Sequence, residues 1–139
     1  MRQVRTARKL VRMGYILLVE DNQDNANMIT HILESERYEV RHFNRGLPAA
    51  HAARQDRPDL IVMDFNLPDV DGRVLTLLLV QQLGGGLKAP PIIACTARVG
   101  TVEAKLAEQS GCSAFLSKPF APENLLTLVH QFVPPPSSG

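Results

Sequence analysis

The sequence has no tryptophan, few other aromatic residues and only two cysteines among its 139 residues. Two cysteines do not make the disulfide framework of a small secreted domain, so we expect Cys95 and Cys112 to be small core residues in a reducing compartment. No run of about 18 apolar residues is present, which argues against membrane insertion. No apolar run follows the basic residues near the start, so no signal peptide is predicted. These absences favour a cytoplasmic protein.

The net charge of +1 excludes a strongly basic or acidic protein, but the charges are unevenly distributed. Residues 1–13 contain five basic residues and no acidic one, whereas the rest of the chain has ten basic and fourteen acidic residues. We predict that residues 1–13 are a disordered basic leader, with a tether to an acidic partner, nucleic acid or a membrane surface as the alternative. Residues 134–139 are rich in proline and serine and are predicted to be a flexible tail. The folded domain is therefore expected to span residues 14–133, with no second domain after it.

Five short apolar runs have the length and boundaries of strands, and segments of helical spacing separate them. The predicted strands cover residues 15–19, 39–42, 60–63, 91–95 and 114–117. The predicted helices follow the cap residues 22–25, include residues 47–53, 74–83 and 102–107, and start again near Pro122. Strictly alternating strands and helices predict an α/β fold: a five-stranded parallel sheet, doubly wound, with five helices on its two faces.

Polar or charged residues stand at the ends of four of these strands. Glu20 and Asp21 follow the first strand, Asp64 the third, Thr96 the fourth and Lys118 the fifth. The carboxyl ends of parallel strands meet at one edge of the sheet, where α/β folds build their sites. We therefore expect these five side chains to converge.

Their chemistry indicates phosphoryl transfer. Three neighbouring carboxylates repel one another and favour a hard cation, and ligand sets made only of oxygen suit Mg²⁺. A lysine ammonium can neutralise a phosphoryl group, and a threonine hydroxyl can donate a hydrogen bond to it. Such a site can accept a phosphoryl group as an aspartyl phosphate. The four histidines are scattered, and we do not predict them to be metal ligands or phosphohistidines.

Four motifs, taken together and in this order, resemble the receiver domains of bacterial two-component response regulators, the CheY-like family. The motifs are LLVEDN at 17–22, MDFNLPDVDG at 63–72, IACTA at 93–97 and LSKPF at 116–120. The resemblance covers roughly residues 15–133. It implies a single-domain receiver with the flavodoxin-like strand order 2-1-3-4-5.

The resemblance assigns a role to each matched acidic position. Asp64 would be the phosphoacceptor. Asp21 would bind Mg²⁺ (or Mn²⁺) directly, Glu20 would bind it mainly through water, and the backbone carbonyl of Asn66 would complete the protein ligands.

Three further positions would connect the site to the rest of the domain. Lys118 would neutralise phosphoryl charge and form a cis peptide bond with Pro119. Thr96 would close onto the phosphoryl group, and Phe115 would then turn inward as a switch residue. Phe115 lacks the hydroxyl of a tyrosine, and a plain core role for it stays open. The responding surface would comprise the fourth helix, the fifth strand and the fifth helix.

The implied function is a signalling phosphoacceptor, not an enzyme apart from self-phosphorylation and autodephosphorylation. Its partners would be a histidine kinase or a histidine phosphotransfer protein, and a downstream protein target that the sequence does not identify. DNA binding is not expected, because no helix-turn-helix domain is present and the predicted folded part is acidic.

Two other readings stay open. A degenerate receiver that only docks would have lost an acid, the acceptor or the lysine, and none is missing. An aspartyl-phosphate hydrolase of the haloacid-dehalogenase type needs a second acid two residues after its nucleophile, where Asn66 stands. Such a hydrolase also carries its nucleophile on the first strand.

The third helix is unusually apolar. Its core stripe is predicted to contain Leu75, Leu78, Leu79 and Gln82. We predict that Leu77 and Val80 lie off this stripe, are partly exposed and join an apolar patch. The patch would suit a partner or a second copy in a homodimer; a wide core stripe with ordinary apolar exposure is the alternative.

Overall fold

A computed structural model describes residues 14–84, 89–97 and 100–136. The predicted leader and the last residues of the predicted tail lie outside these ranges. Within the described residues, no helix has the length and apolar character needed to span a bilayer.

The five predicted strands form one parallel sheet. They are β1 (Tyr15–Val19), β2 (Glu39–Phe43), β3 (Leu60–Asp64), β4 (Ile92–Thr96) and β5 (Ala114–Ser117). Their order in the sheet is β2-β1-β3-β4-β5, and every neighbouring pair is parallel. The order implied by the family resemblance is thus confirmed, and the strand ends lie within one residue of those predicted.

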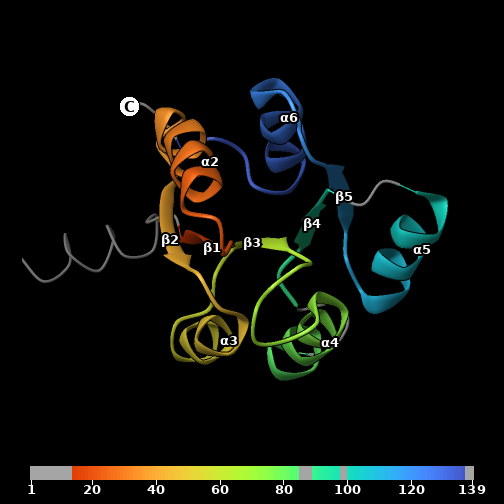
Figure 1. The fold of residues 1–139 in the computed structure, drawn as a ribbon. Helices are drawn as coiled ribbons and strands as arrows, with labels where there is room; N and C mark the ends of the chain where they lie inside the picture. The colour runs from red at the N-terminus through yellow and green to blue at the C-terminus, as the bar shows by residue number, and fades with distance from the viewer. Residues whose placement is uncertain (1–13, 85–88, 98–99, 137–139) are drawn as a thin grey trace, which may run out of the picture.

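Helices cover both faces of the sheet. They are α2 (Gln23–Ser35), α3 (Gly46–Gln55), α4 (Gly72–Gln82), α5 (Thr101–Ser110) and α6 (Pro122–Phe132). Figure 1 shows α2 and α6 on one side of the sheet, α3 and α4 on the other, and α5 beyond β5. Through Ala107, α5 joins the same core cluster as α3 and α4. The predicted doubly wound α/β fold is confirmed.

The central strands are buried on both faces, which explains their continuous apolar sequences. Leu17 and Ile61 enter the core cluster beneath α3 and α4. Leu18 and Val62 enter the cluster beneath α2 and α6. The two clusters hold the sheet between helical layers and leave the carboxyl ends of its strands free to build a site.

Side-chain caps fix the starts of the helices near this edge. Asn22 accepts a hydrogen bond from the backbone N–H of Asn25 at the start of α2, and Asp71 caps α4 in the same way. Asp69 reaches farther: its carboxylate accepts from the backbone N–H groups of Gly46 and Leu47 at the start of α3. The β3–α4 loop is therefore anchored to two helices.

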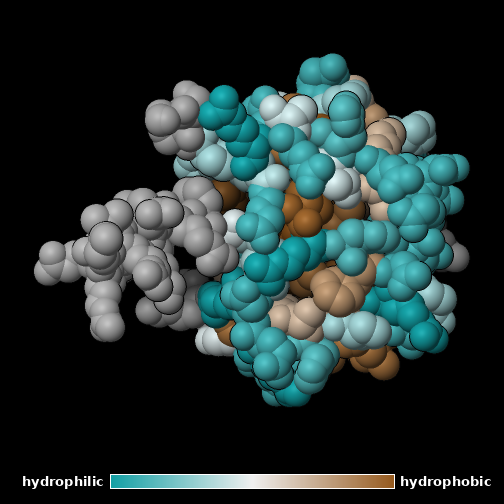
Figure 2. Space-filling model, turned by 90° about the vertical axis from the view of Figure 1, so that its left-hand side faces the viewer, coloured by the Kyte–Doolittle hydropathy of each residue, from teal (hydrophilic) through white to brown (hydrophobic). Residues whose placement is uncertain are grey.

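The edge strand β2 is shielded by charge. Arg41 on this strand forms ion pairs with Glu39 and Asp56 and lies over the ring of Tyr15, 3.9 Å from its centroid. Figure 2 views the molecule from the side on which β2 lies, and most of the coloured surface there is hydrophilic. Charged side chains on an exposed edge oppose pairing with another strand.

The buried face of α4 differs from the prediction in one respect. Leu78 was predicted to face the core, and this is wrong, because its side chain is 37% exposed. Thr76 is buried instead; its hydroxyl donates to the carbonyl of Gly72 at 2.8 Å and lies 3.7 Å from Sγ of Cys112. A hydroxyl whose hydrogen bond is satisfied within its own helix can be buried at little cost.

Candidate functional site

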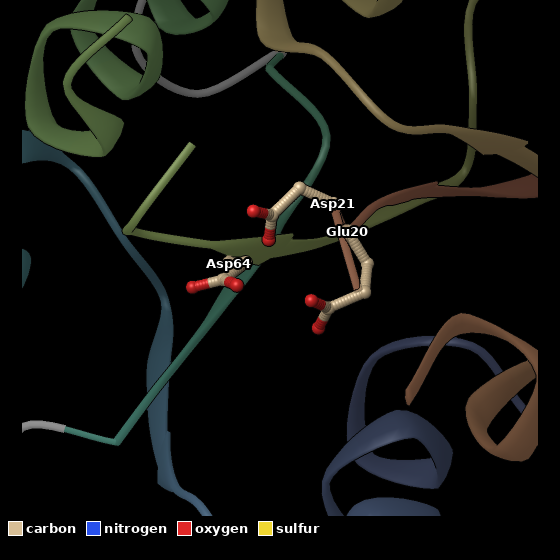
Figure 3. A group of neighbouring side chains, drawn as sticks. All are labelled: Glu20, Asp21 and Asp64. Carbon is tan, nitrogen blue, oxygen red and sulfur yellow. The ribbon is translucent and has the colours of Figure 1, made fainter. Parts of the chain in front are cut away.

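Three carboxylates meet where β1 and β3 end (Figure 3). Glu20 and Asp21 directly follow β1, and Asp64 is the last residue of β3. One oxygen from each carboxylate can be chosen so that all three lie within 4.8 Å of one another. Glu20 and Asp64 are buried, whereas Asp21 is exposed at the mouth of the cluster. The predicted convergence of these residues is confirmed.

Lys118 places a positive charge beside two of the carboxylates. Its Nζ donates to Oε1 of Glu20 at 2.7 Å and to Oδ2 of Asp64 at 3.1 Å. Its backbone N–H donates to the carbonyl of Thr96 at 2.8 Å, which ties the end of β5 to the end of β4. The peptide bond between Lys118 and Pro119 is cis, as the family resemblance implied.

The site is electrostatically unbalanced. Burial raises the pKa of Glu20, the hydrogen bond from Lys118 opposes this, and the charge of Asp64 raises it further. Burial by itself lowers the pKa of Lys118, but its bonds to Glu20 and Asp64 and their negative charges outweigh burial and raise it. The cluster thus contains three carboxylates and one ammonium, and its excess of negative charge favours the binding of a further cation.

The loop after β3 holds the acceptor carboxylate from the other side. The backbone N–H of Asn66 donates to Oδ1 of Asp64 at 2.9 Å. The amide nitrogen of Asn66 lies 3.5 Å from the hydroxyl oxygen of Thr96, which is buried. An antiparallel bridge between Asn66 and Asp71 closes the loop. Asn66 therefore contacts Asp64 directly and also lies next to Thr96.

Phe115 belongs to the core on the side of the sheet that α3, α4 and α5 cover. It lies on β5 opposite Ala94, is half-buried, and packs against the core beneath α3, α4 and α5. With Ala104 and Ala107 it lines a hollow of about 170 Å³ between α5 and β5. Its predicted role as a switch residue stays a prediction.

Two adjoining hollows lie between α4 and α5, and the first of them reaches the site. The first, about 200 Å³, is lined by Asn66 and Thr96 and also by Val102 and Leu106 of α5. The second, about 300 Å³, shares Leu106 and reaches Leu77. The sequence does not predict this groove, because the groove depends on how two separate helices pack.

The prediction for α4 is confirmed where it concerns exposure: Leu77 is 55% exposed, and Val80 is partly exposed. Val80 packs against the core, however, and the exposed apolar neighbours of Leu77 along the groove are Val74 and, from α5, Val102. We call Val74, Leu77, Val102 and Leu106 the α4–α5 patch.

Another hollow, of about 390 Å³, opens beside Lys118. Met28 and Ile29 of α2 line one wall, and Pro119 and Phe120 line the other. Met28 is 42% exposed, whereas Ile29 beside it is buried.

One residue that the sequence analysis set aside contacts the site. Nε2 of His42, on β2, lies 2.7 Å from the backbone carbonyl oxygen of Glu20. Only the strand pairing brings these two residues together, so the sequence carries no direct signal of the contact.

Comparison with known proteins supports what the geometry indicates. Residues 16–130 match the response regulator receiver domain, so the chain belongs to that family. It is a phosphoacceptor signalling domain of the two-component type.

A similar curated protein is the polar-differentiation response regulator DivK of Brucella anthropi. The two are 33% identical over 118 residues, which cover 85% of this chain and 94% of DivK. The chemotaxis protein CheY4 of Vibrio cholerae superposes with a TM-score of 0.80 at 27% identity, covering 88% of this chain and all of CheY4.

The receiver domain of the sensor histidine kinase PA1611 from Pseudomonas aeruginosa is also similar. Its TM-score is 0.77 and its identity 34%, with 87% of this chain and 98% of that domain covered. That domain was solved with a magnesium ion coordinated in its active-site cleft.

Proposed function

We propose that Asp64 accepts a phosphoryl group from the histidine of a kinase or of a histidine phosphotransfer protein. The observation that carries the proposal is the placement of the Asp64 carboxylate at the end of β3, bonded to Lys118 and to the N–H of Asn66. In the transfer, an Asp64 oxygen forms a bond to phosphorus while the bond from phosphorus to the donor nitrogen breaks, and that nitrogen keeps the electron pair. The Lys118 ammonium neutralises charge beside the new bond.

Mg²⁺ (or Mn²⁺) is the cofactor that fits these residues. Asp21, Glu20, Asp64 and the backbone carbonyl of Asn66 would hold it. The support is the cluster of carboxylate oxygens within 4.8 Å, its excess of negative charge, and the magnesium ion in the PA1611 receiver domain. When bound, the cation neutralises charge on the phosphoryl oxygens.

Phosphorylation then shifts the domain between two conformations. Thr96, one wall of the groove that opens beside Asn66, would close onto the phosphoryl group, and Phe115 would move inward. The surface that responds comprises α5, β5 and α6, which lie at the β5 edge of the sheet (Figure 1). This is a population shift, in which the phosphoryl group stabilises a conformation that the free protein visits less often.

The phosphoryl donor would contact the domain at the hollow beside Lys118. This hollow is lined by apolar side chains of α2 and of residues 119–120, and it borders the ammonium that faces Asp64. An apolar wall next to the reacting carboxylate suits a protein donor better than a small anion.

The remaining parts of the proposal follow from this role. The domain carries out only its own phosphorylation and dephosphorylation, and it binds a protein target of unknown identity. The α4–α5 patch would meet a partner or a second copy of the chain. A cytoplasmic location suits the two buried, free cysteines.

Mass spectrometry after treatment with acetyl phosphate and Mg²⁺ tests the acceptor. The native protein should gain one phosphoryl group, EDTA should prevent the gain, and Asp64→Asn should show none. Asp59→Asn is a matched control, because Asp59 precedes β3 at its opposite end. An EDTA-sensitive gain that persists in Asp64→Asn would show that another residue is the acceptor.

Two measurements separate the alternatives: this mass gain, and the release of phosphate from a phosphoester substrate. A docking module would take up no phosphoryl group in any variant. A hydrolase would release phosphate continuously from a phosphoester substrate, whereas a receiver takes up one equivalent.

A further inference from the structure

His42 supplies a hydrogen bond that the sheet itself does not. In the parallel pairing of β1 with β2, His42 lies opposite Leu18. The last backbone hydrogen bond between the ends of these two strands runs from the N–H of Glu20 to the carbonyl of Phe43, at 3.0 Å. Beyond Phe43 the chain turns away toward α3, whose N-cap is Arg45. Among the described residues, no backbone N–H reaches the carbonyl of Glu20.

The carbonyl of Glu20 needs a hydrogen-bond donor because it is buried. Glu20 is only 1% exposed, and buried carbonyl groups in native proteins are almost always hydrogen-bonded. Nε2 of His42 lies 2.7 Å from its oxygen. A carbonyl can only accept, so the proton of this hydrogen bond is on Nε2.

The carbonyl belongs to the peptide group that joins Glu20 to Asp21. Rotation of this peptide group would redirect both side chains, but their other restraints are unequal. The Glu20 carboxylate is held by Lys118 and by the backbone N–H of Asn22. The Asp21 carboxylate has no hydrogen-bond or ion-pair partner among the described residues, so its direction depends mainly on the backbone.

We infer that His42 is a positioning residue, which orients the Glu20–Asp21 peptide so that the Asp21 carboxylate faces the cation site. The inference rests on the proposed Mg²⁺ site. Interactions that orient metal ligands typically change metal affinity by about 10- to 100-fold when they are removed.

The test measures Mg²⁺ affinity by calorimetry, together with the urea midpoint in EDTA. His42→Leu removes the donor, and His42→Asn keeps an amide that is too short to reach the carbonyl. His42→Gln places an amide N–H at about the reach of Nε2 and should restore binding. His31→Leu is the control, since His31 is an exposed histidine on α2.

We expect the dissociation constant for Mg²⁺ to rise about tenfold or more in His42→Leu and His42→Asn, and to stay near the native value in His42→Gln and His31→Leu. In an Asp21→Ala background, His42→Asn should have no further effect, because its action passes through Asp21. Three results would overturn the inference. His42→Asn could bind Mg²⁺ with native affinity, or His42→Gln could bind it as weakly as His42→Asn. The third is that His42→Asn lowers the affinity as much in the Asp21→Ala background as it does in the native protein. If the native protein itself binds no Mg²⁺, the proposed cation site fails, and the inference falls with it.

Discussion

Replacing Asp21 with asparagine should stabilise the protein in EDTA and remove most of the stabilisation that Mg²⁺ gives the native chain. The reason is the crowding of three carboxylates around one ammonium. Asp21 is the exposed member, and Lys118 pairs with the other two. The asparagine side chain keeps the shape of the residue and one ligand oxygen but removes the charge.

The magnitude follows from the geometry. The chosen carboxylate oxygens lie within 4.8 Å of one another. At that separation two unit charges repel by about 0.9 kcal/mol in a water-like dielectric, the appropriate value for an exposed side chain. Two such repulsions, reduced by the attraction of Asp21 to Lys118, leave a gain of about 1 kcal/mol in the free energy of unfolding. By contrast, Mg²⁺ at 100 times its dissociation constant stabilises a protein that binds it by about 2.7 kcal/mol.

Urea denaturation in EDTA and in excess MgCl₂ measures both effects. Glu34→Gln is the control, because Glu34 is an exposed acid on α2 away from the cluster. The native protein and the control should gain similar stability from Mg²⁺, and Asp21→Asn should gain much less. If Asp21→Asn proved less stable than the native protein in EDTA, carboxylate repulsion would not govern the stability of the empty site.

Three further outcomes can be measured. A Cβ atom on residue 72 would lie 2.6 Å from Cα and 2.5 Å from Cδ1 of Phe65. Gly72→Ala should therefore lower the free energy of unfolding by about 1–2 kcal/mol, because this overpacking costs more than the helix propensity that alanine adds. Urea midpoints test this, and a higher midpoint would show that the β3–α4 loop moves to accommodate the methyl group. Leu77→Glu should weaken target binding or self-association, as followed by sedimentation velocity, with phosphoryl uptake unchanged; unaltered association would remove the α4–α5 patch from the proposal. Burial raises the pKa of Cys95 to about 12 and that of Cys112 to about 11, so both should resist a thiol-specific reagent at mildly alkaline pH until urea unfolds the chain. Rapid labelling of the folded protein would contradict the burial of the thiols. Because the thiols of the unfolded chain lose their protons first, the free energy of unfolding should also fall as the pH rises from the ordinary thiol pKa toward these values.

The sequence by itself determined the strands, the alternation of strands with helices, and the residues at the carboxyl edge. Local patterns are sufficient for these features, since a buried strand must be apolar over its whole length and must end at turn residues. The convergence of Asp21, Asp64 and Lys118 needed only one further inference, that the strands are parallel. The strand order, by contrast, came from resemblance to a family and not from the pattern.

The tertiary structure decided which side of each helix is buried and which distant residues meet. Leu78 and Met28 are apolar, and their spacing suits a core stripe, yet both are exposed, because the rotation of a helix depends on the elements that it packs against. The bond from His42 to the carbonyl of Glu20 and the cap that Asp69 provides for α3 join residues 22 and 23 positions apart. Such contacts depend on strand register and loop closure, for which no short stretch of sequence carries a signal.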